Sequence, residues 1–543
     1  MRSLFAVLLL LDATALAQPT INAVQNNYSQ LPSALPNYAF AQGSIVTIYG
    51  NNMAPSVLVS GEFNPALNKI LGGVSVKFTV NNSTTEGIPY YVSSTQLAVI
   101  IPSATPIGSG TLTVTYNNQS SAAFPIQIVQ SAFGILTMNG TGFGQAAVLD
   151  TNFAYISLTN AANEGAFVSF WGTGLGADQN DETRLITNQQ NQTTVPFEFY
   201  IGNKRAEVLY HGRSQYPGLD QVVVNVPTGV AGCFVSAYAK TGNYISNFVT
   251  FPVALTGKVC SDADFTTSQI QTLSSKTTIR TGSVNVTLSK RTVAALGPST
   301  PATSSTGNAV VAGFYQASSS DYFNNYGRFA PSVGSCVLSN MVPPFYGYIN
   351  YANLGGGTTG TFKLPNNTTL PMSTTSYGFF LAGASNSSSS PVFLPDSGGT
   401  YTYSGNGNAT IGASTASIAS IPSLTWVGGE GVLNIPRSQG FEVVWTGADP
   451  NTLIRIYGES NTAYTPNVTR YSEFACTVRA SAGRFTIPRD LLASMVPTGS
   501  DETTPIGTLY VYALGPTGTF TAPGTDAAFA QYSFYHTTRV RYQ

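Results

Sequence analysis

The sequence predicts an all-β fold, with tandem immunoglobulin-like β-sandwiches followed by a larger β-rich C-terminal region. Three observations favour it: a repeated set of strand-like blocks in the first half, a composition rich in strand and turn formers, and a near absence of amphipathic helical patterns. The 543 residues include 53 glycines, 31 prolines and 29 tyrosines. Because glycine and proline mark turns and tyrosine favours strands, we expect many short strands joined by tight turns.

The repeat pairs three blocks of the chain in the same order and at nearly constant spacing. Each block is a short run rich in valine, isoleucine, threonine or aromatic residues, which is typical of a strand. The paired blocks are 43–50 with 165–172, 96–102 with 221–227, and 110–116 with 232–238. Several such strands within about 110 to 125 residues predict an immunoglobulin-like sandwich for each copy.

The repeat places one sandwich at residues 18–129 and a second at residues 130–255. Residues 256–543 lack the repeat but stay rich in strand-like runs, and they form one β-rich region or two subdomains. Within this region, the small and polar residues of 296–308 predict a loop, and one short helix is expected over 489–495.

Residues 1–17 have the layout of a signal peptide. Arg2 precedes a short apolar run over 4–11, and a small-residue cleavage site follows at 15–17. The run is too short to cross about 30 Å of hydrocarbon, and no later run is long enough. We therefore expect an exported chain that begins near Gln18, lacks a transmembrane segment, and is extracellular or attached to the cell surface.

The cysteines fit an exported chain, because disulfides persist in oxidising compartments. There are four, Cys233, Cys260, Cys336 and Cys476, and four cysteines allow three pairings. We expect Cys233–Cys260, which would tie the end of the second sandwich, and Cys336–Cys476, which would stay inside the C-terminal region. No C-x-x-C spacing is present, so a zinc site is not expected.

Further motifs surround the repeat. The block at 43–50 reads GSIVTIYG, and those at 96–102 and 221–227 read QLAVIIP and QVVVNVP. Between the two copies, 133–137 reads FGILT and 142–147 reads GFGQAA.

These motifs resemble the patterns G-S-x-V-x-I-x-G, Q-x-N-x-x-V-P and P-G-I-F-T … G-x-G-Q-A-A of an uncharacterised family. It is the immunoglobulin-like domain family of secreted Solibacter-type (acidobacterial) proteins, which is related to IPT/TIG sandwiches. The chain departs from the patterns at Phe133, where the family has proline, and at Ala98 and Val223, where it has asparagine. The resemblance spans residues 21–255 and implies an exported all-β protein, but it implies no reaction.

The charge balance excludes one class of partner. Charged residues make up 9% of the chain, with 23 Lys and Arg against 24 Asp and Glu. A nucleic-acid binder needs a surplus of basic residues to neutralise phosphates, so nucleic acid is not expected as a partner. No catalytic residues are predicted, because His211 and His536 are the only histidines and no G-x-S-x-G motif is present.

Two groups of acidic residues are candidate calcium ligands. Asp178, Asp181 and Glu182 cluster in one predicted loop and offer the oxygen ligands that calcium prefers. Asp262 and Asp264 form a D-x-D pair beside a cysteine. Neither group has the spacing of an EF-hand loop, and the alternative interpretation of the first is a solvated loop. No other cofactor is expected.

Tyrosines among asparagine, serine and threonine are the feature that points to a ligand. If 345–351 is a strand, Tyr346, Tyr348 and Asn350 lie on one face. Flat rings and amides on an uncharged surface suit a sugar, so these residues are candidate ligand contacts. Tyr401 and Tyr403 are a similar pair. The alternative interpretation is that the tyrosine face of 345–351 is a second packed face or a cross-strand ladder.

The sequence therefore favours a secreted or cell-surface, non-catalytic protein for adhesion or extracellular binding, with a polysaccharide or a surface protein as partner. One alternative is an extracellular carbohydrate-active enzyme with two carboxylates in 256–543. Another is a structural surface or matrix component whose exposed sheet edges pair between copies.

Overall fold

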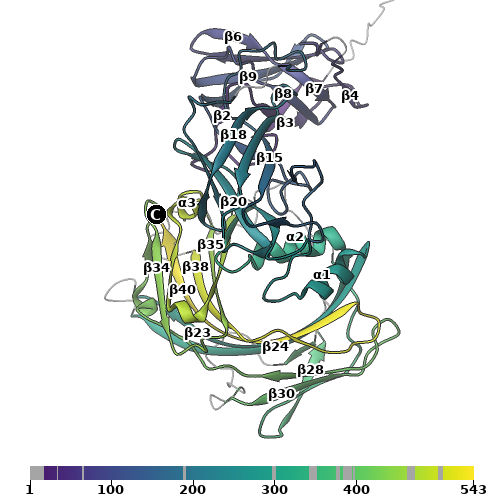
Figure 1. Ribbon diagram of the computed structural model, residues 1–543, viewed down its shortest axis with the longest axis vertical. Coiled ribbons are helices and arrows are strands. Elements are labelled where there is room, and N and C mark those ends of the chain that lie inside the picture. Colours follow the sequence, from purple (N-terminus) through teal and green to yellow (C-terminus); the bar gives the residue numbers. More distant parts are fainter. Residues whose placement is uncertain are drawn as a thin grey trace, which may run out of the picture.

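A computed structural model describes residues 17–33, 35–63, 66–187, 191–295, 301–341, 351–374, 380–382, 394, 398–461, 471–498 and 506–543. About 50% of the chain is strand and 6% is helix, so the predicted all-β fold is confirmed. Figure 1 shows the first sandwich at one end of an elongated molecule, the second in the middle, and a large curved sheet at the other end. Apart from Ala17, the predicted signal peptide lies outside the described residues. Among the helices of the described part of the chain, none has the length and apolar character of a membrane span.

The first sandwich consists of two facing sheets. One has the strand order β1-β3-β8-β7-β4, and the other has the order β2-β11-β9-β5-β6 with β10 beside β9. Alternate residues of β5 are buried between the sheets, because successive side chains of a strand point to opposite faces. The strands are β1 (Thr20–Asn26), β2 (Phe40–Ala41), β3 (Ile45–Asn51), β4 (Val59–Ser60), β5 (Val74–Val80), β6 (Ser83–Glu86), β7 (Ile88–Val92), β8 (Gln96–Ile100), β9 (Gly108–Tyr116), β10 (Gln119–Ser120) and β11 (Phe124–Val129).

The second sandwich repeats this plan. Its sheets have the orders β12-β15-β19-β18, with β13 beside β15, and β14-β22-β20-β16-β17, with β21 beside β20. The strands are β12 (Gly134–Ile135), β13 (Val148–Leu149), β14 (Ala162–Asn163), β15 (Phe167–Thr173), β16 (Phe197–Ile201), β17 (Lys204–Ala206), β18 (Val208–Arg213), β19 (Asp220–Asn225), β20 (Gly232–Thr241), β21 (Tyr244–Ile245) and β22 (Val249–Ala254). The sequence repeat is reproduced in space: β3 pairs with β8 as β15 pairs with β19, and the parallel pair of β2 and β11 matches that of β14 and β22.

A buried arginine lies where the two sandwiches meet. Arg213 Nη1 is 2.6 Å from Asp220 Oδ1, its Nε is 3.2 Å from Asp178 Oδ2, and the three side chains are at most 4% exposed. Its guanidinium also contacts the first sandwich at Gly43, where a Cβ would lie 2.5 Å from Arg213 Nη2. Burial raises the pKa of Asp220 to about 6 against the opposing effect of the arginine. The junction therefore depends on Arg213 remaining as the counter-charge.

Arg213→Met should destabilise the protein by about 3–5 kcal/mol, because it leaves two carboxylates buried without their cation. The matched control is Arg184→Met, whose ion pair with Asp181 has side chains 56% and 55% exposed, and it should cost less than about 1 kcal/mol. Urea unfolding of the purified proteins measures both. Equal, small losses of stability for the two variants would contradict the role of Arg213 as a buried counter-charge.

One 15-stranded sheet dominates the C-terminal region. Its order is β25-β36-β35-β38-β40-β23-β24-β29-β28-β27-β30-β31, with β26 beside β24 and with β33 and β39 beside β40. A small second sheet has the order β32-β34-β37. The elements are α1 (Thr267–Ser274), β23 (Thr278–Val293), β24 (Thr303–Ser318), α2 (Ser319–Phe329), β25 (Cys336–Met341), β26 (Ala352–Asn353), β27 (Gly360–Lys363), β28 (Thr369–Thr374), β29 (Phe380–Ala382), β30 (Thr400–Gly405), β31 (Ser414–Ala419), β32 (Thr425–Trp426), η1 (Gly429–Gly431), β33 (Asn434–Ile435), β34 (Phe441–Thr446), β35 (Leu453–Asn461), β36 (Tyr471–Arg479), η2 (Ala480–Ala482), β37 (Arg484–Ile487), α3 (Arg489–Ala493), β38 (Gly507–Leu514), β39 (Gly518–Thr519) and β40 (Ala527–Tyr542).

The central strands of this sheet bury one face only. In β40, Ala528, Ala530, Tyr532 and Phe534 are buried, and the residues that alternate with them over 529–535 are half-buried on the opposite face. The buried face packs into the main core with β30 and β31, because the sheet folds back until β31 contacts β40. We call the opposite face, on the side of α1 and α2 in Figure 1, the inner face.

Two helices and one strand in this region differ from the sequence predictions. No helix was expected at α1 or α2, yet Thr266 and Gln269 form a capping box that begins α1, and Ser318 accepts a hydrogen bond from the backbone of Asp321 to begin α2. The loop predicted over 296–308 is wrong from Thr303 onward, because those residues pair with β23 as part of β24. The short helix expected near Arg489 is present as α3.

Both expected disulfides form. Cys233–Cys260 ties β20 of the second sandwich to the segment that enters the C-terminal region. Cys336–Cys476 joins β25 to β36, where the two cysteines are direct cross-strand partners. All four cysteines are at most 1% exposed.

Replacing Cys336 and Cys476 together by alanine should destabilise the protein more than replacing Cys233 and Cys260. Cys336–Cys476 closes a loop with a sequence separation of 140 residues, and Cys233–Cys260 closes one of 27 residues. A longer closed loop removes more entropy from the unfolded chain. The expected stabilisation is therefore about 5 kcal/mol for Cys336–Cys476 and about 3.5 kcal/mol for Cys233–Cys260. Denaturant midpoints of the two double variants test the order, and a larger loss for the shorter bridge would contradict it.

Candidate ligand-binding site

A cavity of about 450 Å³ opens on the inner face of the large sheet. That volume lies in the range of small-molecule sites, about 300–1,000 Å³. Its aromatic lining is Tyr315, Tyr322, Tyr326, Tyr351 and Phe529, together with Phe265. Its polar lining includes Asp264, Ser283, Asn285, Thr517 and Gln531.

The floor of the cavity follows from the register of three long strands. Ser283 of β23 lies opposite Phe529 of β40, and Asn285 lies opposite Gln531. Residues two apart on a strand share a face, so all four side chains reach the same side of the sheet. Tyr315 of β24 extends this surface.

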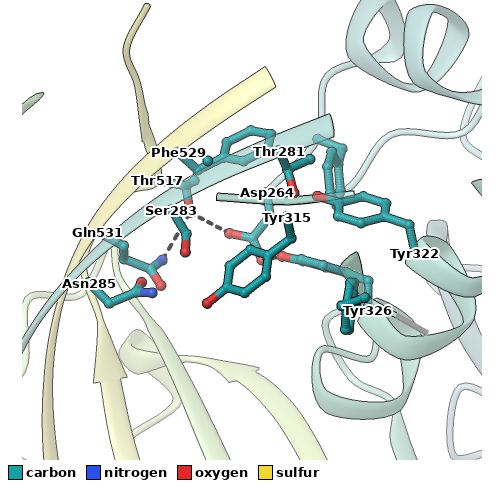
Figure 2. A pocket seen from close by; sticks show the side chains of 13 residues that line it. Asp264, Thr281, Ser283, Asn285, Tyr315, Tyr322, Tyr326, Thr517, Phe529 and Gln531 are labelled. Carbon is teal, nitrogen blue, oxygen red and sulfur yellow. Dashed lines mark hydrogen bonds between the residues drawn. The ribbon is translucent and has the colours of Figure 1, made fainter. Parts of the chain in front are cut away.

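The wall opposite the amides comes from helix α2. Tyr322 and Tyr326 lie four residues apart and therefore project from the same side of the helix. Figure 2 shows their rings at one end of the cavity, with Asn285 and Gln531 at the other end and Tyr315 between. The cavity therefore has an aromatic end and an amide end.

The single carboxylate of the described lining is held by the protein itself. Tyr326 Oη donates a hydrogen bond to Asp264 Oδ2, and Thr517 Oγ1 donates one of 2.6 Å to Asp264 Oδ1. Arg455 Nη2 lies 3.6 Å from Asp264 Oδ2. Gln531 Nε2 in turn donates to Thr517 Oγ1 at 2.9 Å, as the dashed lines of Figure 2 show. Arg455 therefore balances the negative charge of Asp264 beside the cavity.

The phenol groups of the cavity are neutral near pH 7. Burial raises the pKa of Tyr315 to about 12 and raises the pKa of Tyr322. Burial, and then the charge of Asp264, raise the pKa of Tyr326 well above its ordinary value. Protonated phenols donate and accept hydrogen bonds, so the wall offers neutral polar groups between apolar rings.

Several polar groups of the floor are open to a ligand. Among the described residues, no protein group bonds the Ser283 hydroxyl, the Asn285 side chain or the Gln531 amide oxygen. Asn285 is exposed, whereas Ser283 is half-buried. A ligand that brings both donors and acceptors would satisfy these groups.

The second sandwich fixes the helical wall of the cavity. Phe234 of β20 packs on Tyr326 with ring centroids 5.4 Å apart, and Phe265 packs on Tyr326 at 4.7 Å. The Cys233–Cys260 disulfide holds the segment that carries Phe265 and Asp264. The sandwich thus supports the cavity without lining it.

The tyrosines singled out from the sequence have different outcomes. Tyr346, Tyr348 and Asn350 lie outside the described residues, and their proposed contact with a ligand stays a prediction. Their neighbour Tyr351 lines the cavity and accepts a hydrogen bond of 2.6 Å from Asn325 Nδ2. Tyr401 and Tyr403, by contrast, are fully buried in the main core.

Each carboxylate of the first calcium candidate has its own protein partner. Asp178 pairs with Arg213, Asp181 accepts from Thr183 and Arg184, and Glu182 accepts from the backbone and hydroxyl of Ser103. Of the D-x-D pair, Asp262 accepts from Cys233 N and Ser332 Oγ. Within the described ranges, no group of three or more His, Cys, Asp or Glu residues is arranged to hold a metal ion. The structure does not bring Asp178, Asp181 and Glu182 together around a common centre.

Sequence reasoning missed most of the cavity. Its residues come from segments that are far apart in the chain, and the pairing of β23 with β40 brings them together. Two local signals were present: the alternation of Ser283 and Asn285 with valines, and the spacing of Tyr322 and Tyr326.

Tyr326→Phe should lower the free energy of unfolding by about 1.5–3 kcal/mol, the typical contribution of a hydrogen bond to a charged group. The matched control is Tyr351→Phe, whose hydroxyl accepts a solvent-exposed hydrogen bond from Asn325, and it should cost less than about 1 kcal/mol. Urea unfolding measures both. A larger loss for Tyr351→Phe would show that Asp264 does not organise the cavity.

Comparison with known proteins assigns a family to the first sandwich alone. Residues 30–128 match the IPT/TIG domain family, which supports the expected relation to IPT/TIG sandwiches. No curated protein matches the sequence.

Solved structures align with much of the chain at low similarity. One, described as being with a xylogluco-oligosaccharide, is 8% identical, covers 87% of this chain and 97% of its own, and has a TM-score of 0.14. SGBP-B from a xyloglucan utilization locus in Bacteroides uniformis is 12% identical, with coverages of 68% and 86% and a TM-score of 0.16. SGBP-B from a mixed-linkage glucan utilization locus of Bacteroides ovatus is 9% identical, with coverages of 87% and 97% and a TM-score of 0.16. Likenesses this weak carry no argument about the ligand of this chain.

Proposed function

We propose that this protein binds an uncharged glycan in the cavity on the inner face of the large sheet. The observation that carries the proposal is a lining of six tyrosine or phenylalanine rings beside polar groups that no described protein group bonds, namely the Ser283 hydroxyl, the Asn285 side chain and the Gln531 amide oxygen. A sugar ring has apolar C–H faces that pack on aromatic rings and hydroxyls that exchange hydrogen bonds with amides. The two ends of the cavity match these two requirements.

The described lining of the cavity offers a cation no free carboxylate. Aromatic cages bind quaternary ammonium groups when a ring face or a free carboxylate attracts the charge. Here the Asp264 carboxylate is bonded to Tyr326 and Thr517 and lies 3.6 Å from Arg455. Because that charge is already balanced, the carboxylate adds little to the attraction of the ring faces for a cation, whereas a neutral glycan would use both the aromatic end and the amide end of the cavity.

Binding also fits the cavity better than hydrolysis. Glycosidases most often place two carboxyl groups on either side of the bond that breaks. Asp264 is the one acidic residue in the described lining, and hydroxyl donors occupy both of its oxygens. We therefore propose a binding protein and keep the enzyme as the alternative that a hydrolysis assay would reveal.

We further propose that binding takes place outside the cell. The chain forms two disulfides, and disulfides persist in oxidising compartments. The signal-peptide layout of residues 1–17 supports export.

The purified protein should bind one or more soluble neutral polysaccharides, tested as a panel of glucans, xylans and mannans by affinity electrophoresis and calorimetry. Tyr315→Ala and Asn285→Ala should each weaken the Kd about ten-fold, because each removes a side chain that contacts the ligand. Tyr155→Ala, at a tyrosine of the second sandwich that is 62% exposed, is the matched control and should change nothing.

Two results would contradict the proposal. One is the absence of saturable binding to every neutral polysaccharide, which would favour a structural or protein-binding role. The other is binding that Tyr315→Ala and Asn285→Ala leave unchanged, since this would place the ligand elsewhere.

A further inference from the structure

We propose that the ligand is an oligosaccharide or polysaccharide chain, and that its binding site continues from the cavity along a strip of tyrosines on the same inner face. The strip consists of Tyr457, Tyr510, Tyr512 and Tyr535, and we call it the tyrosine strip. This inference rests on the proposed function, because it assigns further sugar units of the same ligand to a second surface.

The register of the sheet makes the strip continuous. Tyr535 of β40 is the direct partner of Tyr512 of β38, and Tyr457 of β35 is the direct partner of Tyr510. Ring centroids are 4.7 Å apart for Tyr512 and Tyr535, 5.9 Å for Tyr510 and Tyr512, and 5.6 Å for Tyr457 and Tyr510. Four rings therefore form one unbroken surface across three strands.

The strip and the cavity belong to the same surface. Tyr535 and the cavity residue Gln531 lie on the same face of β40, four residues or about 13 Å apart at the rise of a strand. Arg455 forms a second link, since it is the direct partner of Tyr512 and its Nη2 lies 3.6 Å from Asp264 of the cavity. A chain that leaves the cavity along β40 therefore meets the strip.

The strip differs from the buried tyrosines of the core. Its four rings are half-buried, whereas Tyr401 on the buried side is fully enclosed. In the described part of the chain, no protein group bonds the hydroxyls of Tyr512 and Tyr535. Uncovered rings and hydroxyls add no stability to a tyrosine ladder with a purely structural role. A glycan chain, in contrast, would pack on the rings and form hydrogen bonds with the hydroxyls.

The charges near the strip are mixed in sign. Burial raises the pKa of Tyr510 to about 12, the negative charge of Glu459 acts in the same direction, and Arg291 acts against it. Burial raises the pKa of Tyr512 as well. Tyr510 and Tyr512 are therefore neutral phenols, and opposite charges lie beside Tyr510, which suits the same uncharged ligand as the cavity.

The test is the dependence of affinity on chain length. Gluco-, xylo- and manno-oligosaccharides of graded length, from disaccharide to octasaccharide, are titrated into the purified protein by calorimetry. Affinity of the unmodified protein should rise with length beyond the disaccharide. A protein with Tyr512→Ala and Tyr535→Ala should bind the longest oligosaccharide about ten-fold more weakly and bind the disaccharide as before.

A second variant keeps the test valid if the alanine substitutions disturb the sheet. Tyr512→Phe with Tyr535→Phe retains both rings and removes only the hydroxyls. It should keep the thermal midpoint of the unmodified protein and lose several-fold affinity for the longest oligosaccharide alone. Tyr155→Ala serves again as the exposed control.

The outcomes separate this inference from the proposed function. Binding that is as tight for the disaccharide as for the octasaccharide, or that all strip variants leave unchanged, overturns the strip and leaves the cavity site standing. Loss of affinity at every length from Tyr512 and Tyr535 variants that fold normally also overturns it, because the strip would then belong to the first sugar site. Absence of binding to any oligosaccharide overturns both proposals.

Discussion

The central strands of the large C-terminal sheet bury one face and leave the other half-buried, and the rest of the structure depends on this asymmetry. Alternation along β40 sends Ala530, Tyr532 and Phe534 into the main core and leaves Gln531 and Tyr535 on the inner face. Because the sheet folds back on its outer side, where β31 contacts β40, no second layer of the same sheet covers the inner face among the described residues. Helix α2 and the segment before β23 cover part of it, and the cavity lies beneath them.

The second sandwich supports that cover. Phe234 packs on Tyr326 of α2, and the Cys233–Cys260 disulfide anchors the segment that carries Asp264. Arg213, at the junction of the two sandwiches, contacts the first sandwich at Gly43. The sandwiches therefore support the cavity, and the inner face of the large sheet carries the proposed ligand contacts.

The sequence predicted the parts of the fold that repeat or alternate locally. The blocks around 43–50 and 165–172 form equivalent strands, and both cysteine pairs join as expected. The helices at 267–274 and 319–329 were missed because each is short and its signal lies in a cap rather than in an apolar period. The cavity was missed because cross-strand pairing brings its residues together, and a single sequence does not reveal which distant strands pair.

The most direct test of the central claim is a hydrogen–deuterium exchange footprint of the protein with and without a bound neutral polysaccharide. The account predicts slower exchange along 281–285, 315–326 and 529–535, where the ligand covers the inner face and its helical wall, and unchanged exchange in the two sandwiches. Protection confined to residues 20–254, with none on these strands, would contradict the claim that the inner face is the binding surface.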